Sequence, residues 1–325
     1  MTVLTGVSRP RLWVVSPMLR DTESYVRLRR EVTAACAADD RHGEPRFVVV
    51  DDSAGTDDEV VVLRDDPDVT VLTTPFNLGH QRAIVFGLRF LVPHIRSDDV
   101  VVTMDSDGED QPADLPRLVE RLDDPTTSLV LALRTKRSEP LGFRLMYVCF
   151  RLMFRVLTGT TIRSGNFAAQ RGDSLVATID HPSFDLCYSA TLLALRRSTV
   201  TVPCARGQRF AGASRMNRFA LIGHGMRMLL PFSEAIAVRM LVVAAASFAA
   251  LATYLVLLAV GVIGVPLTGA VLAPGIALTV LFLAAFTGFV VLFSGFGQAS
   301  VIAMKGIAVP VHPRTETAAV PADES

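Results

Sequence analysis

A stretch of 65 residues, from Met240 to Met304, contains no Asp, Glu, Lys or Arg. A membrane-spanning helix needs about 20 mainly apolar residues, so this stretch has room for two spans and a turn. The apolar core of a soluble protein is the alternative, but solvent-facing charges normally interrupt a core of this length. Gly and Pro within residues 264–269 supply the turn. We therefore predict a transmembrane hairpin within residues 237–300, with helices near 240–263 and 271–295.

Arginines precede this stretch. From Arg206 to Arg239 there are six arginines and one acidic residue, Glu234, which gives a local charge of +5. Basic residues beside a span mark its cytoplasmic side and favour anionic lipid headgroups. Because two spans return the chain to its starting side, we expect the domain before the hairpin and both termini to lie in the cytosol and the protein in the cytoplasmic membrane. Residues 301–325 are expected to be a disordered tail.

The segment before the hairpin, residues 213–236, is predicted to lie at the membrane surface. Its apolar residues fall on one side of a helix: Phe219, Ile222, Met226, Leu229 and Leu230. Its polar residues fall on the other: Asn217, His224 and Arg227. Such a helix lies in the plane of the membrane interface. Packing of the apolar side against the rest of the protein is the alternative.

Residues 1–212 show short apolar strands alternating with helical patterns, which predicts an α/β domain. Continuous β-branched runs indicate strands buried on both faces, and hence a largely parallel sheet covered by helices. The predicted strands are Arg11–Pro17, Arg46–Ser53, Val69–Thr74, Asp99–Asp105 and Ser128–Arg134. Helices are predicted around Tyr25–Ala35, Gln81–Leu91 and Leu115–Leu122. The start of the chain has no apolar stretch typical of a signal peptide.

Cysteine usage and motifs exclude several classes of protein. The four cysteines (Cys36, Cys149, Cys187 and Cys204) are scattered without C-x-x-C spacing, which indicates free thiols in a reducing compartment. The sequence has no G-x-G-x-x-G and no P-loop motif. The formal net charge is zero, and we expect no nucleic-acid partner. A homo-oligomer is left open.

Acidic residues follow two of the predicted strands. Asp51 and Asp52 end one, and Asp105 and Asp107 end another. Ligands of parallel sheets bind at the carboxyl ends of strands. Two carboxylates spaced Asp-x-Asp after a buried strand suit Mg²⁺ or Mn²⁺, which is often shared with substrate phosphates. An EF-hand fails on spacing, because Asp110 and Pro116 occupy its Gly and Glu positions. Solvated acids that offset a helix dipole remain the alternative for Glu109, Asp110 and Asp114.

Several motifs in order resemble family 2 glycosyltransferases. They are VVVDDSAGTDD, NLGHQRAIVFGL, MDSDGEDQP, RTKR, SGNF and RGQRFAGASRMN. Together with the amphipathic segment and the hairpin, they resemble the polyprenyl-phosphate members, such as dolichol-phosphate mannose synthases and bactoprenol glucosyltransferases. The resemblance implies a GT-A-type fold. It also implies inverting transfer of a sugar from a nucleoside diphosphate, UDP- or GDP-linked, to a polyprenyl phosphate for cell-envelope glycan or glycoconjugate synthesis.

The resemblance assigns residues to this reaction. Asp105 and Asp107 would be the metal ligands and the catalytic residues. Donor nucleotide contacts would come from Pro17, Asp21, Asp51, Asp52, Asn77, Gln81, Asp105 and Ser106. The acceptor phosphate would be held by Arg134, Arg137, Arg144, Arg206, Arg209 and Ser214, with solvated surface arginines as the alternative. The sugar would contact Gly165 and Asn166. Asn166 replaces an acid common in the family, and Tyr147 stands where a serine is common.

Two other functions fit the same sequence. One is a membrane glycosyltransferase that uses a saccharide or protein acceptor. The processive enzymes of that kind usually carry more spans and a Gln-x-x-Arg-Trp motif, which this chain lacks. The other is a non-catalytic membrane scaffold, against which the intact Asp-x-Asp argues.

Overall fold

The computed structural model describes residues 9–134, 141–162, 164–211, 218–261 and 269–293. The chain divides into two compact units. Residues 9–134 and 164–211 belong to the first unit, and residues 141–162, 218–261 and 269–293 belong to the second. Residues 141–162 therefore belong to the second unit, although the sequence assigns all of residues 1–212 to one domain. The predicted hairpin turn and the C-terminal tail lie outside the described residues.

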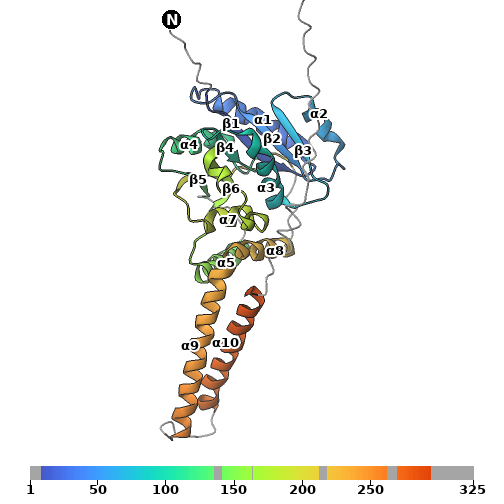
Figure 1. The fold of residues 1–325 in the computed structure, drawn as a ribbon. Coiled ribbons are helices and arrows are strands. Elements are labelled where there is room, and N and C mark those ends of the chain that lie inside the picture. The colour runs from blue at the N-terminus through green and yellow to red at the C-terminus, as the bar shows by residue number, and fades with distance from the viewer. Residues whose placement is uncertain (1–8, 135–140, 163, 212–217, 262–268, 294–325) are drawn as a thin grey trace, which may run out of the picture. The chain divides into compact units, whose positions relative to one another are not determined.

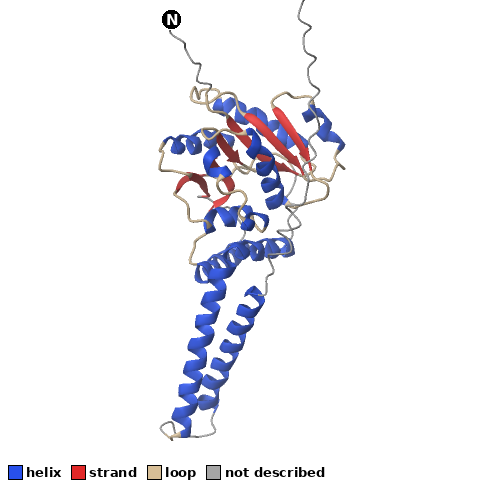
Figure 2. Ribbon diagram, in the orientation of Figure 1, coloured by secondary structure: helices blue, strands red, loops and turns tan. Residues whose placement is uncertain are grey.

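The first unit contains a seven-stranded sheet in the order β3-β2-β1-β4-β6-β5-β7 (Figure 1, Figure 2). The strands are β1 (Leu12–Met18), β2 (Arg46–Asp51), β3 (Val69–Thr73), β4 (Val100–Thr103), β5 (Leu129–Arg134), β6 (Ser164–Arg171) and β7 (Thr199–Cys204). All neighbouring strands are parallel except those that pair with β6, which runs antiparallel to both β4 and β5. The prediction of a largely parallel sheet is confirmed.

Helices cover both faces of this sheet. They are α1 (Thr22–Cys36), α2 (Val61–Arg64), α3 (His80–Leu91), α4 (Leu115–Glu120), α6 (Gly172–Val176) and α7 (Tyr188–Ala194). One face packs in a single apolar core with α1, α2 and α4, through Tyr25, Leu63 and Leu118 among others. On the other face α3 approaches closely. A Cβ on Gly87 would lie 2.7 Å from Val50 and 2.9 Å from Val15, so glycine allows this helix to pack on the strands.

Each predicted strand and helix in this unit is present, with ends displaced by up to three residues. The predicted strand at 99–105 is shorter, because Asp99, Met104 and Asp105 lie outside the ladder of β4. The predicted helix at 115–122 ends at Glu120 and continues as a 3₁₀ turn at Arg121–Asp123. Strands β6 and β7 were not predicted. The four cysteines all lie among the described residues and none of them forms a disulfide, as expected.

Asp99 holds together the amino-terminal edge of the sheet. Its fully buried carboxylate accepts hydrogen bonds from the backbone N–H of Arg11 at 2.8 Å and of Arg96 at 3.0 Å, and from the Trp13 indole at 3.2 Å. Burial raises its pKa, but these donors outweigh burial and hold the pKa below its usual range. The carboxylate therefore contributes to stability in its charged form.

Replacing this carboxylate should destabilise the protein in a pH-dependent way. We expect Asp99→Ala to cost about 2–3 kcal/mol, because it leaves buried donors unpaired. The folded pKa lies below the unfolded value of about 3.9. The stabilisation is therefore complete above that pH and is lost as pH falls through the folded pKa. Thermal unfolding of the full chain in detergent, followed by the fluorescence of Trp13, measures this.

The control is Asp98→Asn, whose carboxylate is half exposed and pairs with Arg96. This variant should unfold like the wild type. A gap between Asp99→Ala and the wild type that stays constant from pH 6 to pH 3 would contradict the electrostatic account.

The second unit is helical. It contains α5 (Leu141–Thr158), α8 (Arg218–Leu229), α9 (Ser233–Ala259) and α10 (Gly269–Phe293). In Figure 1, α9 and α10 lie side by side, and Phe248 contacts Phe282 with ring centroids 5.9 Å apart. Elsewhere along the two helices, Gly275 packs against Tyr254, since a Cβ on Gly275 would lie 3.1 Å from that ring. Among the described residues, one continuous helical segment, Leu221–Ala259, is long and apolar enough to cross a membrane, and Ala273–Gly288 forms a shorter apolar helix.

Helices α5 and α8 carry exposed apolar side chains. On α8, Ile222 and Met226 are each 57% exposed, whereas Leu229 is buried. The predicted apolar side of this helix is therefore divided between an exposed and a buried part. The side chain of Phe219, and Asn217 altogether, lie outside the described residues. Helix α5, which was not predicted, exposes Val148, Leu152 and Val156 and buries Phe154 against Phe232.

Candidate active site

Polar residues gather where β1, β2 and β4 end. The antiparallel β6 begins at this same edge, because Ala168 pairs with Thr103 at the end of β4. Two residues other than glycine adopt left-handed backbone conformations just after strands, namely Arg20 (φ 48°) after β1 and Ala54 (φ 59°) after β2. Strained backbone of this kind clusters at functional sites. The carboxyl edge of the sheet is therefore the candidate location of the active site.

Asp52 anchors the loop between β3 and α3. Its carboxylate accepts the backbone N–H of Leu78 at 2.6 Å and of Gly79 at 2.9 Å, and the Thr74 hydroxyl at 3.2 Å. The side chain of Asn77 donates to the Asp52 carbonyl at 3.0 Å. Burial raises the pKa of Asp52, against the effect of these donors. This carboxylate fixes the start of α3, which brings His80 and Gln81 to the edge.

Asp105 is the centre of the polar network. The Asn166 amide donates to its Oδ1 at 3.1 Å, and Nε2 of His80 lies 3.1 Å from the same oxygen. On the other side, Arg134 lies 4.0 Å from Oδ2 and pairs with Asp110 at 3.2 Å. A Cβ on Gly165 would lie 2.8 Å from the Arg134 guanidinium, so glycine at this position leaves room for the arginine.

Gln81 orients the Asn166 amide. Its Nε2 donates to Asn166 Oδ1 at 2.6 Å, which leaves the Asn166 NH₂ group facing Asp105. The Gln81 carbonyl is itself held, because it accepts the backbone N–H of Ser189 at 2.9 Å and its hydroxyl at 3.1 Å. The start of α7 thus sets the position of a side chain that touches the acidic cluster.

A segment after β7 covers the turn that carries Asp107. We call this segment, residues 205–211, the strap. Arg209 pairs with Asp107 at 2.7 Å, and Arg206 pairs with Glu109. The backbone is bonded as well, because Phe210 N–H donates to the Asp107 carbonyl and Gly207 N–H donates to the Glu109 carbonyl, both at 2.8 Å. The Phe210 ring packs against Gly108 (φ 83°). A Cβ on Gly108 would lie 2.6 Å from this ring, so glycine leaves room for it.

Three carboxyl groups in this cluster, those of Asp105, Asp107 and Asp110, have shifted pKa values. Burial and the neighbouring Asp105 carboxylate raise the pKa of Asp107, and the same causes raise the pKa of Asp110 to about 7. Burial would raise the pKa of Asp105 too, but pairing with His80 and Arg134 outweighs it and holds this pKa well below its usual range. Such spread among neighbours is expected when like charges share a low-dielectric site.

The donor set at this turn suits a divalent cation. Asp105 and Asp107 offer hard carboxylate oxygens that are only partly buried, each side chain being 14% exposed. No set of three or more His, Cys, Asp or Glu side chains in the described part of the chain is arranged to hold a metal alone. Mg²⁺ is usually bound by one or two carboxylates that share the ion with substrate phosphates.

The remaining predicted residues are distributed around this edge. Pro17 is buried within β1, Asp21 precedes α1, and Ser106 is buried in the turn after β4. Asp51 is buried and accepts the backbone N–H of Ser53. Arg137, Ser214 and the side chain of Arg144 lie outside the described residues.

Sequence reasoning missed two members of the network. His80 was not assigned any role, although it stands inside the motif NLGH, and Asp110 was given no site role, with a solvated acid as its alternative. Asp110 is 4% exposed and accepts the Asp105 backbone N–H at 3.1 Å, so it belongs to the buried cluster.

Residues 22–181 match glycosyl transferase family 2. They form a family 2 glycosyltransferase domain. This match contains Asp51, Asp52, Asp105, Asp107 and Arg134, and so covers most of the network.

Curated relatives of the family 2 domain share its sequence at moderate identity. An undecaprenyl-phosphate 4-deoxy-4-formamido-L-arabinose transferase from Pectobacterium atrosepticum is 28% identical over 154 residues, which are 46% of this chain and 44% of the relative. The enzyme of the same name from Pseudomonas syringae is 32% identical over 112 residues, 33% of this chain and 31% of the relative. The chain thus matches less than half the length of these relatives.

A solved structure similar to this chain is glucosyl-3-phosphoglycerate synthase from Mycobacterium tuberculosis, crystallised with Mn²⁺, UDP and glucosyl-3-phosphoglycerate. The TM-score is 0.47 with 15% identity, over 70% of this chain and 80% of the synthase.

Proposed function

We propose that the protein is a metal-dependent glycosyltransferase that moves a sugar from a nucleoside diphosphate to a polyprenyl phosphate in the membrane. The observation that carries this proposal is the pair Asp105 and Asp107, which lies at the carboxyl edge of a family 2 domain and is faced by Arg134 and Arg209. The acceptor is inferred from the curated relatives, whose names specify undecaprenyl phosphate.

The chemistry follows from the charges involved. The second pKa of a phosphate monoester is near ~6, so the attacking oxygen is already largely ionised at neutral pH and needs little help from a general base. Mg²⁺ or Mn²⁺ bound at Asp105 and Asp107 would neutralise the departing diphosphate. The acceptor is a second anion and must approach this site. Arg134, Arg206 and Arg209 are proposed to hold it, because a guanidinium binds phosphate in a bidentate manner.

The Gln81–Asn166 pair is proposed to border the donor sugar. The Asn166 amide faces Asp105 and is itself buried, so it can donate to a ligand beside the metal only in the orientation that Gln81 fixes. Asn in place of the acid common in the family therefore keeps a hydrogen-bonding group at this position. The donor nucleotide is proposed to lie across the ends of β1 and β2, near Asp21, Asp51 and Asn77.

Helices α9 and α10 are proposed to span the membrane as a hairpin. At 1.5 Å per residue, the 27 residues of α9 and the 25 residues of α10 each exceed the ~30 Å of a bilayer core. Their outward side chains are apolar, as Phe248 and Val280 illustrate. The exposed apolar residues of α5 and α8 support the proposal that these two helices lie at the membrane interface. Arg151 and Arg155 on α5 would meet anionic headgroups.

Reporter fusions should reveal the topology. We expect a reporter after Ser325 to behave as cytosolic, because arginines precede α9 and a two-helix hairpin returns the chain to the same side. A reporter inserted within residues 262–268 is the matched control and should behave as external. Two fusions that report the same compartment would contradict the hairpin.

A substrate screen tests the function itself. Purified full-length protein is incubated with Mn²⁺, a polyprenyl phosphate and each of a set of UDP- and GDP-sugars, and the lipid product is identified by mass spectrometry. We expect a glycosyl phosphoprenol from at least one donor. Transfer to a saccharide with none to the lipid would support the alternative acceptor class. If the protein neither transfers the sugar nor hydrolyses the donor with any nucleotide sugar, the result would support the non-catalytic scaffold.

A further inference from the structure

The positive charge of Arg209 lies at the Asp107 carboxylate, where a divalent metal ion would bind. Its Nη2 lies 2.7 Å from Asp107 Oδ2. Mg²⁺ binds carboxylate oxygens at about 2.0–2.1 Å. A divalent ion on the same oxygen would therefore come close to the guanidinium, and like charges at that separation repel strongly in a partly buried site. The ion and Arg209 thus compete for one carboxylate.

In this position, the hydrogen-bonding capacity of the Arg209 guanidinium is not fully satisfied. In the part of the chain that the structure describes, its Nε is buried and has no hydrogen-bond partner. An unsatisfied buried donor is destabilising, because it has lost its hydrogen bonds to water without replacement. The Arg209 Nη2 contacts one carboxylate oxygen of Asp107, and the other oxygen accepts the Glu109 backbone N–H. The pair neutralises a repelling cluster without the bidentate geometry that makes such pairs strong.

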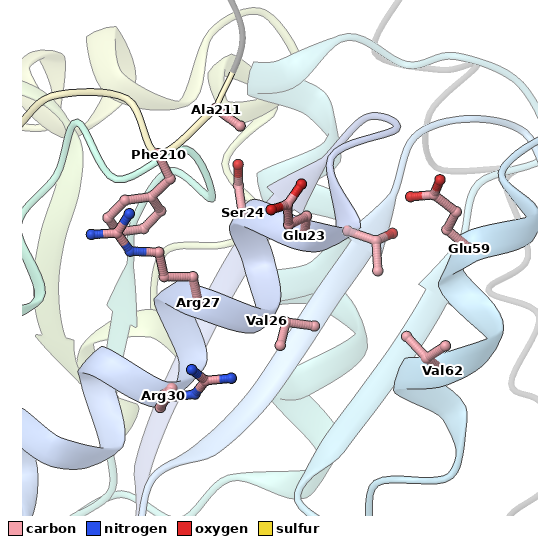
Figure 3. Close-up of a pocket in the computed structure, with 10 residues that line it drawn as sticks. Glu23, Ser24, Val26, Arg27, Arg30, Glu59, Val62, Phe210 and Ala211 are labelled. Carbon is pink, nitrogen blue, oxygen red and sulfur yellow. The ribbon is translucent and has the colours of Figure 1, made fainter.

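We call the turn that carries Asp107 and Glu109 the metal turn. Other contacts attach the strap backbone to it. Phe210 and Gly207 donate to the carbonyls of Asp107 and Glu109. On its other side, the Phe210 ring is stacked under the guanidinium of Arg27 from α1 at 4.1 Å (Figure 3). Phe210 also lines a groove of about 540 Å³ along α1. These contacts hold the strap backbone, so the Arg209 side chain can leave Asp107 while its backbone remains beside the site.

We propose that Arg209 is a tethered counterion that occupies the metal position at Asp107 until metal and donor bind, and is then released to hold the acceptor phosphate. The proposal rests on the function proposed above. It explains how one residue can face the acidic cluster and also serve an anion. It also imposes an order, because the acceptor site gains its arginine only after the metal and donor are in place. Coupling of this kind is reciprocal, so an acceptor phosphate should tighten metal–donor binding.

Metal binding without turnover tests the first half. Mn²⁺ is titrated calorimetrically into full-length wild-type protein, Arg209→Gln and Arg209→Lys in detergent. We expect Arg209→Gln to bind Mn²⁺ about tenfold more tightly, because the competing charge is gone, and Arg209→Lys to bind it like the wild type. The control is Arg41→Gln, which removes an exposed arginine paired with Asp39 and Asp123 and should leave Mn²⁺ affinity unchanged.

Acceptor binding tests the second half. The affinity of farnesyl phosphate, a short acceptor probe, is measured with and without Mn²⁺ and UDP. We expect wild-type affinity to rise about tenfold with Mn²⁺ and UDP, and this gain to be absent in Arg209→Gln. Equal or weaker Mn²⁺ binding by Arg209→Gln, or a wild-type affinity for farnesyl phosphate that ignores Mn²⁺ and UDP, would overturn the counterion role alone. Absence of Mn²⁺ binding in every protein would instead overturn the metal assignment on which the proposed function depends.

Discussion

Asp107→Asn should abolish sugar transfer while the protein still folds and inserts. Asparagine keeps the size of the side chain and removes the charge that a divalent cation needs. Loss of one metal ligand is expected to cost several kcal/mol of transition-state stabilisation, or roughly a thousandfold or more in rate. The rate of lipid glycosylation and the Mn²⁺ affinity are measured together, so that a catalytic loss is linked to a binding loss.

A matched control separates this effect from general damage to the acidic loop. Asp114→Asn removes a carboxylate from the same loop, where Asp114 pairs with Arg117 and lies outside the cluster around Asp105. We expect it to keep nearly full activity. Wild-type activity in excess EDTA, or near-normal turnover by Asp107→Asn, would show that the pair does not bind a required metal.

The sheet was predictable because its strands are strongly patterned. Uninterrupted β-branched runs such as Val48–Val50 and Val100–Val102 have few alternatives to a buried parallel strand. Strand β6 lacks this signal. Its sequence, SGNFAAQR, contains glycine and two alanines, which favour strands poorly, and only its pairing with β4 and β5 makes it one. Tertiary context, not local propensity, decides such a segment.

The candidate site was predictable in its acids and not in its contacts. Asp105 and Asp107 stand at a strand end, and the topology of parallel sheets places strand ends at the ligand edge. The partners of these acids come from far along the chain: Asn166 is 61 residues from Asp105. No local pattern encodes that distance. The arginines assigned to an acceptor phosphate were identified as anion binders, but the anions that Arg134 and Arg209 contact here are carboxylates of the protein.

Helix α5 shows a different limit. Its apolar and basic residues have helical spacing over Leu141–Thr158, and it lies soon after the strand-like run that ends at Arg134, within the stretch predicted as one α/β domain. Sequence order favoured assigning it to that domain. Its contacts, such as Phe154 with Phe232, instead place it in the helical unit. Membership of a unit depends on long-range packing, which periodicity does not report.

Gly207→Ala should reduce transfer at least a hundredfold. A Cβ at this position would lie 2.3 Å from the Gly108 carbonyl oxygen, far closer than real Cβ contacts, and the obstacle is backbone that cannot rotate away. The strap must therefore lift from the metal turn, breaking the hydrogen bonds that Gly207 and Phe210 donate. Arg206 and Arg209 move with it. Two charge-assisted contacts to phosphate, at about 1.5–3 kcal/mol each, account for a loss of this size.

Gly43→Ala provides the control, because the same methyl group there meets no atom within 4 Å and the backbone does not need a positive φ. It should leave transfer and thermal stability unchanged. For Gly207→Ala, Mn²⁺ affinity should persist or increase, since Asp105 and Asp107 remain and Arg209 has withdrawn, while farnesyl phosphate binding weakens. Full transfer activity in Gly207→Ala would mean that contact between the strap and the metal turn is not needed for the reaction. Loss of Mn²⁺ binding would mean that the strap instead supports the metal ligands directly.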